Sequence, residues 1–208
     1  MVILKSKHEI EAIRKACQVV AECHRTIAPL IKPGITTNEI ERIFEVIILK
    51  HGAKPYEKGY KGYQYATCAS VNDVIAHGFP SDKPLEEGDI VTIDTVAELD
   101  GWLGDVTSAI QQHAESHGFG VVRDLLAHGI GRGLHEEPTY MHVGKPGKGL
   151  RIKEGMVFTI EPMITEGTYY MTIDPDGWTA RTLDRKLAAQ YEHTVAITAE
   201  GPQILTAQ

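Results

Sequence analysis

The sequence predicts a single domain of the α+β class. Amphipathic helical patterns occupy most of residues 7–52. From about residue 65 they give way to short apolar runs separated by Gly, Pro and Asp turns, which are typical of strands. No low-complexity run or linker divides the 208 residues, so nothing marks a domain boundary. We therefore expect one domain over residues 1–208, with helices and strands around a shared core.

Two helices are predicted at the N-terminal end. Apolar side chains recur at three- and four-residue steps over residues 7–30, and a Lys-Pro-Gly turn ends this stripe at residues 32–34. The second helix begins at a capping box formed by Thr36 and Glu39. It closes at the His-Gly pair of residues 51–52.

Four strand-like segments follow the two helices. They cover residues 65–71, 89–99, 156–164 and 193–198. A third helix is predicted near residues 106–117, after a hairpin tip at residues 100–104. Its expected buried face consists of Val106, Ala109, Ile110 and Ala114.

The second and third helices look like one unit used twice. When the His-Gly pair at residues 51–52 is aligned with the pair at residues 117–118, Glu39 falls on Asp105 and Ile40 falls on Val106. A long helix precedes the first copy, whereas only the hairpin tip precedes the second. By comparison with the first copy, on the order of 40 residues are missing before the second.

Charge and cysteine content narrow the functional classes. The formal net charge of −7 argues against a nucleic-acid partner, which a basic face would attract. The three cysteines form no CxxC pair, so a disulfide framework and a thiolate zinc site are not indicated, and a reducing cytoplasm fits best. The N-terminus does not resemble a signal peptide, and no apolar stretch approaches the ~20 residues of a membrane span, so no membrane partner is expected.

Four carboxylates and one histidine stand out as candidate metal ligands. Two of the carboxylates lie within or at the end of apolar runs, where a buried charge needs a partner. Such a set suits divalent ions that accept oxygen ligands, and its carboxylates can bridge two ions. Each residue taken singly is more simply read as a turn, loop or solvated strand-end side chain. The five candidates are Asp94, Asp105, His128, Glu161 and Glu192.

Several motifs closely resemble the type I methionine aminopeptidases, in order and spacing, over most of the chain. The motifs are CASVN at residues 68–72, HGFP at 77–80, GDIVTID at 88–94, HGIGRGLHEEP at 128–138, TIEPM at 159–163, DGWT at 176–179 and AQYEH at 189–193.

The resemblance implies a fold, a cofactor and a reaction. The fold would be the pita-bread (creatinase/aminopeptidase) fold, with two pseudo-symmetric αβ halves around a curved antiparallel sheet, the second half being incomplete here. The five candidate ligands match residues that hold two divalent metal ions, and the residues leave manganese, iron, cobalt and zinc open. The reaction would be removal of N-terminal methionine from nascent proteins or peptides with a small second residue, by water that the metals activate.

The resemblance also implies roles for further side chains. Glu161 would shuttle protons as well as bind metal, and His77 and His135 would contact the substrate and stabilise the tetrahedral intermediate. An apolar pocket would hold the flexible methionine thioether. Leu134 stands where some relatives have an aromatic residue, which changes the expected pocket shape. The pocket residues would be Tyr60, Tyr63, Cys68, Leu134 and Trp178, although the tyrosines and the cysteine also suit ordinary packing roles.

The chain departs from the family directly after Asp105. Read from the preceding hairpin, Asp105 is a bridging metal ligand; read as the match of Glu39, it belongs in the first turn of a helix. The lost segment would leave an exposed apolar patch and an unpaired strand edge. A deletion, a self-association that covers the gap and an omitted segment all remain open.

Two other functional classes remain as alternatives. One is a catalytically impaired or inactive pita-bread protein that serves as a scaffold or binding protein, which the missing segment favours. The other is a related hydrolase, such as a proline-specific aminopeptidase or creatinase, although those usually carry an additional N-terminal domain. The family implies a monomer that acts on peptide or nascent-chain N-termini, with self-association over the missing segment as the other possibility.

Overall fold

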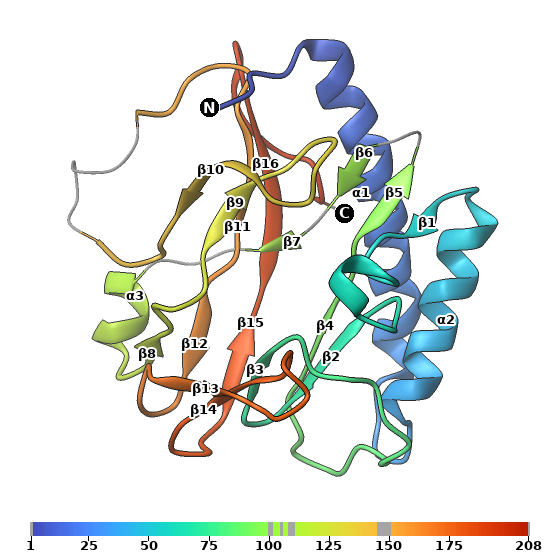
Figure 1. The fold of residues 1–208 in the computed structure, drawn as a ribbon, viewed down its shortest axis with the longest axis vertical. Coiled ribbons are helices and arrows are strands. Elements are labelled where there is room, and N and C mark those ends of the chain that lie inside the picture. Colours follow the sequence, from blue (N-terminus) through green and yellow to red (C-terminus); the bar gives the residue numbers. More distant parts are fainter. Residues whose placement is uncertain (1, 100–101, 105, 108–110, 145–150, 208) are drawn as a thin grey trace.

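The computed structural model describes residues 2–99, 102–104, 106–107, 111–144 and 151–207. Two helices, α1 (Lys7–Ile27) and α2 (Thr37–Lys50), pack against each other along one side of the molecule (Figure 1). A short 3-10 turn, η1 (Ala28–Leu30), extends the end of α1. The predicted helices at residues 7–30 and after Thr36 are therefore confirmed.

Capping boxes fix the start of both helices. The Thr36 hydroxyl accepts a hydrogen bond from the Glu39 backbone N–H at 3.1 Å, and the Glu39 carboxylate accepts one from the Thr36 N–H at 2.8 Å. Ser6 and Glu9 form the same box at α1. The apolar stripes of the two helices then meet in a core cluster that includes Val20, Phe44 and Ile48.

The first half of the chain continues with short strands and one 3-10 turn. These are β1 (Lys54–Pro55), η2 (Tyr60–Gly62), β2 (Cys68–Val71), β3 (Val74–Ala76), β4 (Val91–Asp94), β5 (Ala97–Leu99), β6 (Trp102–Gly104) and β7 (Val106–Thr107).

The second half contains the short helix α3 (Gln111–Ser116) and further strands. The strands are β8 (Gly120–Val121), β9 (Ala127–Gly129), β10 (Glu136–Tyr140), β11 (Val157–Ile160), β12 (Met163–Thr165), β13 (Met171–Ile173), β14 (Ala180–Thr182), β15 (Ala188–Gln190), β16 (Glu192–Thr198) and β17 (Gly201–Ile204).

The described strands pair antiparallel. The largest sheet has the order β10-β9-β11-β16-β17, and β7 pairs with the start of β16. Smaller sheets have the orders β1-β5-β6, β15-β12-β8, β13-β14-β3 and β2-β4. The β14–β3 pairing joins the two halves of the chain, because β3 comes from the first half and β14 from the second. The four predicted strand segments are confirmed, although two of them are each divided into two shorter strands.

The predicted helix over residues 106–117 is wrong at its start. Val106 and Thr107 form strand β7, opposite His193 and Glu192 of β16, and the described helix begins only at Gln111. β-branched residues favour extended backbone, and β16 offers the partner that a local pattern cannot reveal. Ala114 is buried as predicted, whereas Ala109 and Ile110 lie outside the described residues.

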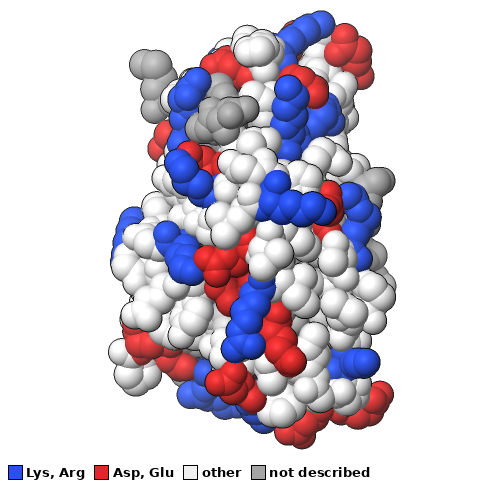
Figure 2. Space-filling model, turned by 90° about the vertical axis from the view of Figure 1, so that its right-hand side faces the viewer, with Lys and Arg blue, Asp and Glu red and all other residues white. Residues whose placement is uncertain are grey.

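The hairpin predicted before this helix is present as the β5–β6 pair, whose tip at residues 100–101 lies outside the described residues. Within the described part of the chain, no helix is long and apolar enough to cross a membrane. Lys, Arg, Asp and Glu side chains are interspersed over the side of the molecule on which α2 lies (Figure 2).

Candidate metal and substrate site

One cavity of about 440 Å³ gathers the predicted site residues. Its walls come from the loop after β1, from β2 to β4, and from the segments around β9, β11 and β16. Each predicted site residue in the described part of the chain lines it. These are Tyr60, Tyr63, Cys68, His77, Asp94, His128, Leu134, His135, Glu161, Trp178 and Glu192. The remaining predicted residue, Asp105, lies outside the described residues.

Neighbouring strands bring three of the predicted ligands together. His128 lies in β9, Glu161 follows β11, and Glu192 opens β16. Because β11 pairs with both β9 and β16, these side chains converge from adjacent strands. Glu161 is 7 % exposed and Glu192 is 6 % exposed, so both carboxylates are shielded from bulk water.

Hydrogen bonds orient His128 and Glu161. The Nδ1 atom of His128 lies 3.1 Å from the Gly129 carbonyl oxygen, to which it must donate its proton. This leaves Nε2 as a lone-pair donor, 3.4 Å from Oε1 of Glu161. The Thr159 hydroxyl donates to the same Glu161 oxygen at 2.7 Å. Burial, with a smaller contribution from His135, lowers the pKa of His128 to about 4.

This arrangement fits a bound cation. A neutral imidazole nitrogen and a carboxylate oxygen face each other as two electron-pair donors, and a metal ion between such groups removes their repulsion. The donor set of one nitrogen and several carboxylate oxygens suits first-row divalent ions. The described strand next to Asp105 also reaches this region, because Thr107 of β7 pairs with Glu192.

The two predicted catalytic histidines both line the cavity. His77 has a left-handed backbone with φ of 55° and packs edge-on against Trp178. His135 packs against His128 with 4.3 Å between ring centroids, and its Nδ1 lies 3.0 Å from the Tyr60 hydroxyl. Burial lowers the pKa of both histidines, so they are neutral over a wider pH range than a free imidazole.

An aromatic and aliphatic pocket adjoins these histidines. Tyr63 is buried and packs edge-on against Trp178 with 5.2 Å between ring centroids. Its hydroxyl lies within hydrogen-bond distance of the backbone carbonyls of Thr67 and Gly78, at 3.1 and 3.0 Å. Leu134 is also buried in this wall. The pocket therefore has mainly apolar surfaces of the kind that accept an unbranched hydrophobic side chain.

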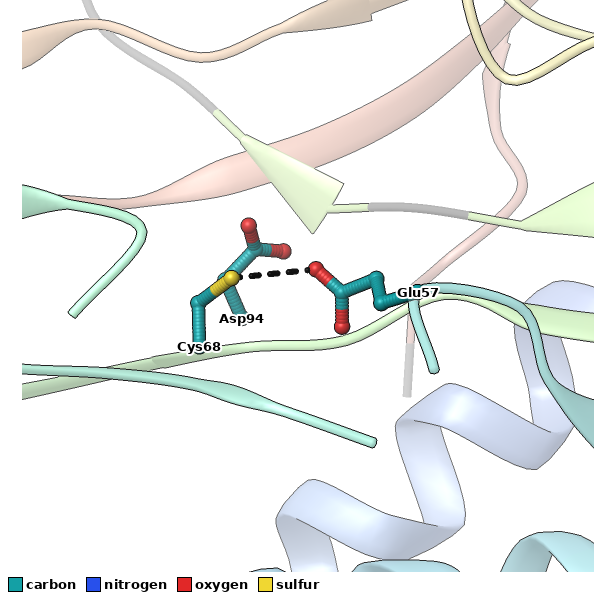
Figure 3. Close-up of side chains that lie close together, drawn as sticks. All are labelled: Glu57, Cys68 and Asp94. Atoms are coloured by element: carbon teal, nitrogen blue, oxygen red, sulfur yellow. Dashed lines mark hydrogen bonds between the residues drawn. The ribbon is translucent and has the colours of Figure 1, made fainter. Parts of the chain in front are cut away.

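Glu57 is a cavity residue that the sequence patterns do not reveal. Its carboxylate is 8 % exposed and accepts a hydrogen bond from the Cys68 thiol at 3.2 Å (Figure 3). Asp94 stands directly opposite Cys68 in the β2–β4 pair, and ligand atoms of Glu57, Cys68 and Asp94 all lie within 4.8 Å of one another. Burial first, and then the charges of Glu57 and Asp94, raise the pKa of the Cys68 thiol. In the sequence, Glu57 reads as an ordinary surface charge beside Lys58.

His142 is a second residue without a sequence signal. Its Nε2 accepts a hydrogen bond from the Glu161 backbone N–H at 2.8 Å, and burial lowers its pKa to about 4. His142 therefore fixes the backbone at the point where Glu161 turns into the cavity. His142 follows β10 and Glu161 follows β11, and the contact between them forms because both strands belong to the same sheet. A local sequence pattern does not reveal which strands lie in one sheet.

Comparison with known proteins shows similarity along the whole chain. The model of metallopeptidase family M24 matches residues 11–108 and again residues 103–199. Methionine aminopeptidase of Clostridium perfringens is 40% identical over 246 residues, which covers 99% of each chain. Methionine aminopeptidase 1 of Bacillus subtilis is 38% identical over 246 residues, with 99% of each chain covered.

Solved structures show the same similarity in three dimensions. The methionine aminopeptidase structures from Rickettsia prowazekii and Thermotoga maritima have TM-scores of 0.95 and 0.96, each at 36% identity and 100% coverage of both chains. Prolidase from Pyrococcus furiosus, at 22% identity and a TM-score of 0.69, shares the fold. These likenesses confirm the predicted pita-bread fold.

The alignments also show what this chain lacks. An alignment of 246 residues with a chain of 208 includes on the order of 40 positions that the relative has and this chain does not. The two matches to the family model overlap at residues 103–108, the point at which the sequence repeat is broken. The difference in length is therefore concentrated around Asp105.

Proposed function

Because this chain belongs to the methionine aminopeptidases of metallopeptidase family M24, we propose that it removes N-terminal methionine from peptides and nascent proteins whose second residue is small. The observation that carries the proposal is the cavity in which four candidate ligands within the described residues, the two histidines and the apolar pocket meet. A substrate whose side chain fills the pocket would present its first peptide bond to the ligand side of the same cavity.

Two divalent metal ions are the proposed cofactor. The proposed ligands are Asp94, Asp105, His128, Glu161 and Glu192. When bound, the ions polarise the substrate carbonyl and lower the pKa of water to supply a nucleophile at neutral pH. Manganese, iron, cobalt and zinc all suit this set, so the proposal leaves the identity of the ions open.

The protein's own groups orient the reactants and move protons. Glu161, which accepts a hydrogen bond from Thr159, is the proposed proton shuttle between water and the leaving amine. His135, hydrogen-bonded to Tyr60, and His77 are proposed to stabilise the negative charge that develops on the carbonyl oxygen. Tyr63, Leu134 and Trp178 support the binding of the methionine side chain by excluding water from it.

An inactive scaffold is the less favoured alternative. Its motivation was the missing segment, yet the ligand-type side chains in the described part of the chain still line one cavity. We also propose that the protein works as a monomer of one domain in a reducing compartment, where the buried thiols of its three cysteines are stable. Sedimentation velocity of the purified chain tests whether the protein is a monomer.

Methionine release from Met-Ala-Ser in excess manganese or cobalt tests the proposed reaction. We expect metal-dependent release that Glu161→Ala abolishes, because this variant lacks both a ligand and the proton shuttle. Glu87→Ala removes an exposed carboxylate outside the cavity and should retain activity. A folded sample that releases no methionine with manganese, cobalt, iron or zinc would refute the proposal.

A further inference from the structure

Glu57 places a buried carboxylate in the wall of the proposed side-chain pocket. It lines the same cavity as Tyr63, Leu134 and Trp178, the surfaces proposed to hold the methionine side chain. Its side chain reaches from the loop after β1 toward Cys68 on β2 and Asp94 on β4 (Figure 3). A carboxyl group in this position is unexpected, because the thioether of methionine brings no hydrogen-bond donor to meet it.

Two polar groups beside Glu57 have hydrogen-bond acceptors within the protein. The Cys68 thiol donates to the Glu57 carboxylate. The Tyr63 hydroxyl is directed to the backbone carbonyls of Thr67 and Gly78. At Glu57 the pocket therefore presents carboxyl oxygens on a background of apolar surface, and Lys61 also lines the cavity.

This chemistry discriminates between side chains of equal size. A side chain that ends in an N–H donor gains a charge-assisted hydrogen bond or an ion pair in a region shielded from water. A thioether or alkyl chain of the same length displaces water from the carboxylate and returns no hydrogen bond. Sites that contain buried polar groups select strongly for ligands that can pair with them.

We propose that Glu57 is a specificity-determining residue, which extends the substrate range to N-terminal residues whose unbranched side chains end in an N–H donor and weakens the preference for methionine. The proposal rests on the proposed aminopeptidase function and on the assignment of Tyr63, Cys68 and Trp178 to the side-chain pocket. It concerns the side chain of the first residue and leaves the bond-breaking groups as described above.

Ornithine, norleucine and methionine provide a matched set of probes, because their unbranched side chains contain the same number of non-hydrogen atoms. The experiment compares kcat/KM for Orn-Ala-Ser, Nle-Ala-Ser and Met-Ala-Ser in the wild type, Glu57→Gln and Glu57→Leu, with manganese present. We expect the ratio of ornithine to norleucine turnover to fall at least tenfold in Glu57→Leu and to fall also in Glu57→Gln, which keeps the shape but removes the charge. Methionine turnover should rise in Glu57→Leu.

Calorimetric binding of ornithinamide and norleucinamide to the same metal-loaded proteins separates this inference from the proposed reaction. If methionine release fails in every sample, the binding ratio still decides the role of Glu57, whereas the proposed function is lost. The inference is overturned if the ratio of ornithine to norleucine agrees within twofold between the wild type and Glu57→Leu, both in turnover and in binding. That result leaves the proposed function intact. Glu87→Leu is the exposed control and should keep the wild-type ratio.

Discussion

Hydrogen bonds to single atoms decide which nitrogen of each site histidine faces the cavity. In His128 the Gly129 carbonyl takes the Nδ1 proton and leaves Nε2 toward Glu161. In His135 the Tyr60 hydroxyl lies 3.0 Å from Nδ1, so Nε2 is the nitrogen left for the proposed substrate contact. The Gly129 carbonyl fixes the tautomer of His128, because it can only accept, whereas the Tyr60 hydroxyl can donate or accept and only determines which nitrogen of His135 it occupies.

Replacing Tyr60 by phenylalanine tests this control over His135. The variant keeps the ring in the pocket wall but removes the hydrogen bond, which contributes about 1 kcal/mol in typical cases. We expect kcat for Met-Ala-Ser to fall about five- to tenfold with a smaller change in KM, because His135 is proposed to act in the transition state. Tyr56→Phe, an adjacent ring, is the control. Equal kcat values in the two variants would contradict the assignment.

The loop between β9 and β10 depends on an ion pair with the N-terminal segment. The Glu136 carboxylate accepts hydrogen bonds from the Arg132 and Gly133 backbone N–H groups at 2.9 and 3.0 Å, and Lys5 Nζ donates to it at 2.5 Å. The Lys5 and Glu136 side chains are 4 % and 11 % exposed. A Cβ atom at Gly131 would lie 2.5 Å from Lys5 Nζ, so a side chain there would displace the end of Lys5 from this pair. This pair holds the loop that carries Leu134 and His135.

Removing the charge of Lys5 should therefore weaken the fold. Lys5→Met keeps most of the side-chain length but leaves Glu136 without its buried counter-ion, which typically destabilises a protein by about 3 kcal/mol. Lys7→Met breaks an exposed pair with Glu200, whose side chains are 80 % and 65 % exposed, and should have a negligible effect. Urea unfolding of both variants measures the difference. Equal midpoints would show that the Lys5 pair contributes no more than a surface pair.

Local patterns predicted the elements that local forces determine. The helices α1 and α2 have their apolar stripes and capping boxes within a few residues, so the sequence alone located them. The local pattern at β7 predicts helix, because the strand partner β16 lies more than 80 residues away in the chain and does not enter such a pattern. The cavity residues were predicted through motif resemblance, whereas Glu57 and His142 belong to no motif. Their contacts with Cys68 and Glu161 depend on tertiary packing that residue spacing does not express.

The whole chain differs from its relatives by a segment in the second half. The first half carries the long helices α1 and α2, whereas the described helix of the second half, α3, has six residues. A second cavity, of about 550 Å³, lies beside α1, β4 and the start of β16, and His24 of α1 lines it. A titratable side chain that lines this cavity has different pKa values in the folded and the unfolded chain. It therefore makes the stability of the whole molecule depend on pH.

His24 makes the free energy of unfolding depend on pH. Burial, in packing that includes Phe44, lowers its pKa from 6.5 to about 4, so the folded state excludes a proton that the unfolded chain binds below pH 6.5. The contribution of neutral His24 is therefore fully present above pH 6.5 and is lost as the pH falls toward 4. At pH 4.5 the loss for this side chain amounts to about 2 kcal/mol.

Urea unfolding at pH 7.0, 5.5 and 4.5 measures this effect in the wild type, His24→Leu and the exposed control His8→Gln. His24→Leu should lose less stability on acidification than the wild type, by about 2 kcal/mol at pH 4.5, while His8→Gln should follow the wild type. His128 and His142 also have pKa values lowered to about 4, and their contribution cancels when the variants are compared. If His24→Leu and the wild type lose stability in parallel, His24 accepts its proton without unfolding, and the cavity beside α1 admits enough water to solvate the imidazolium ion.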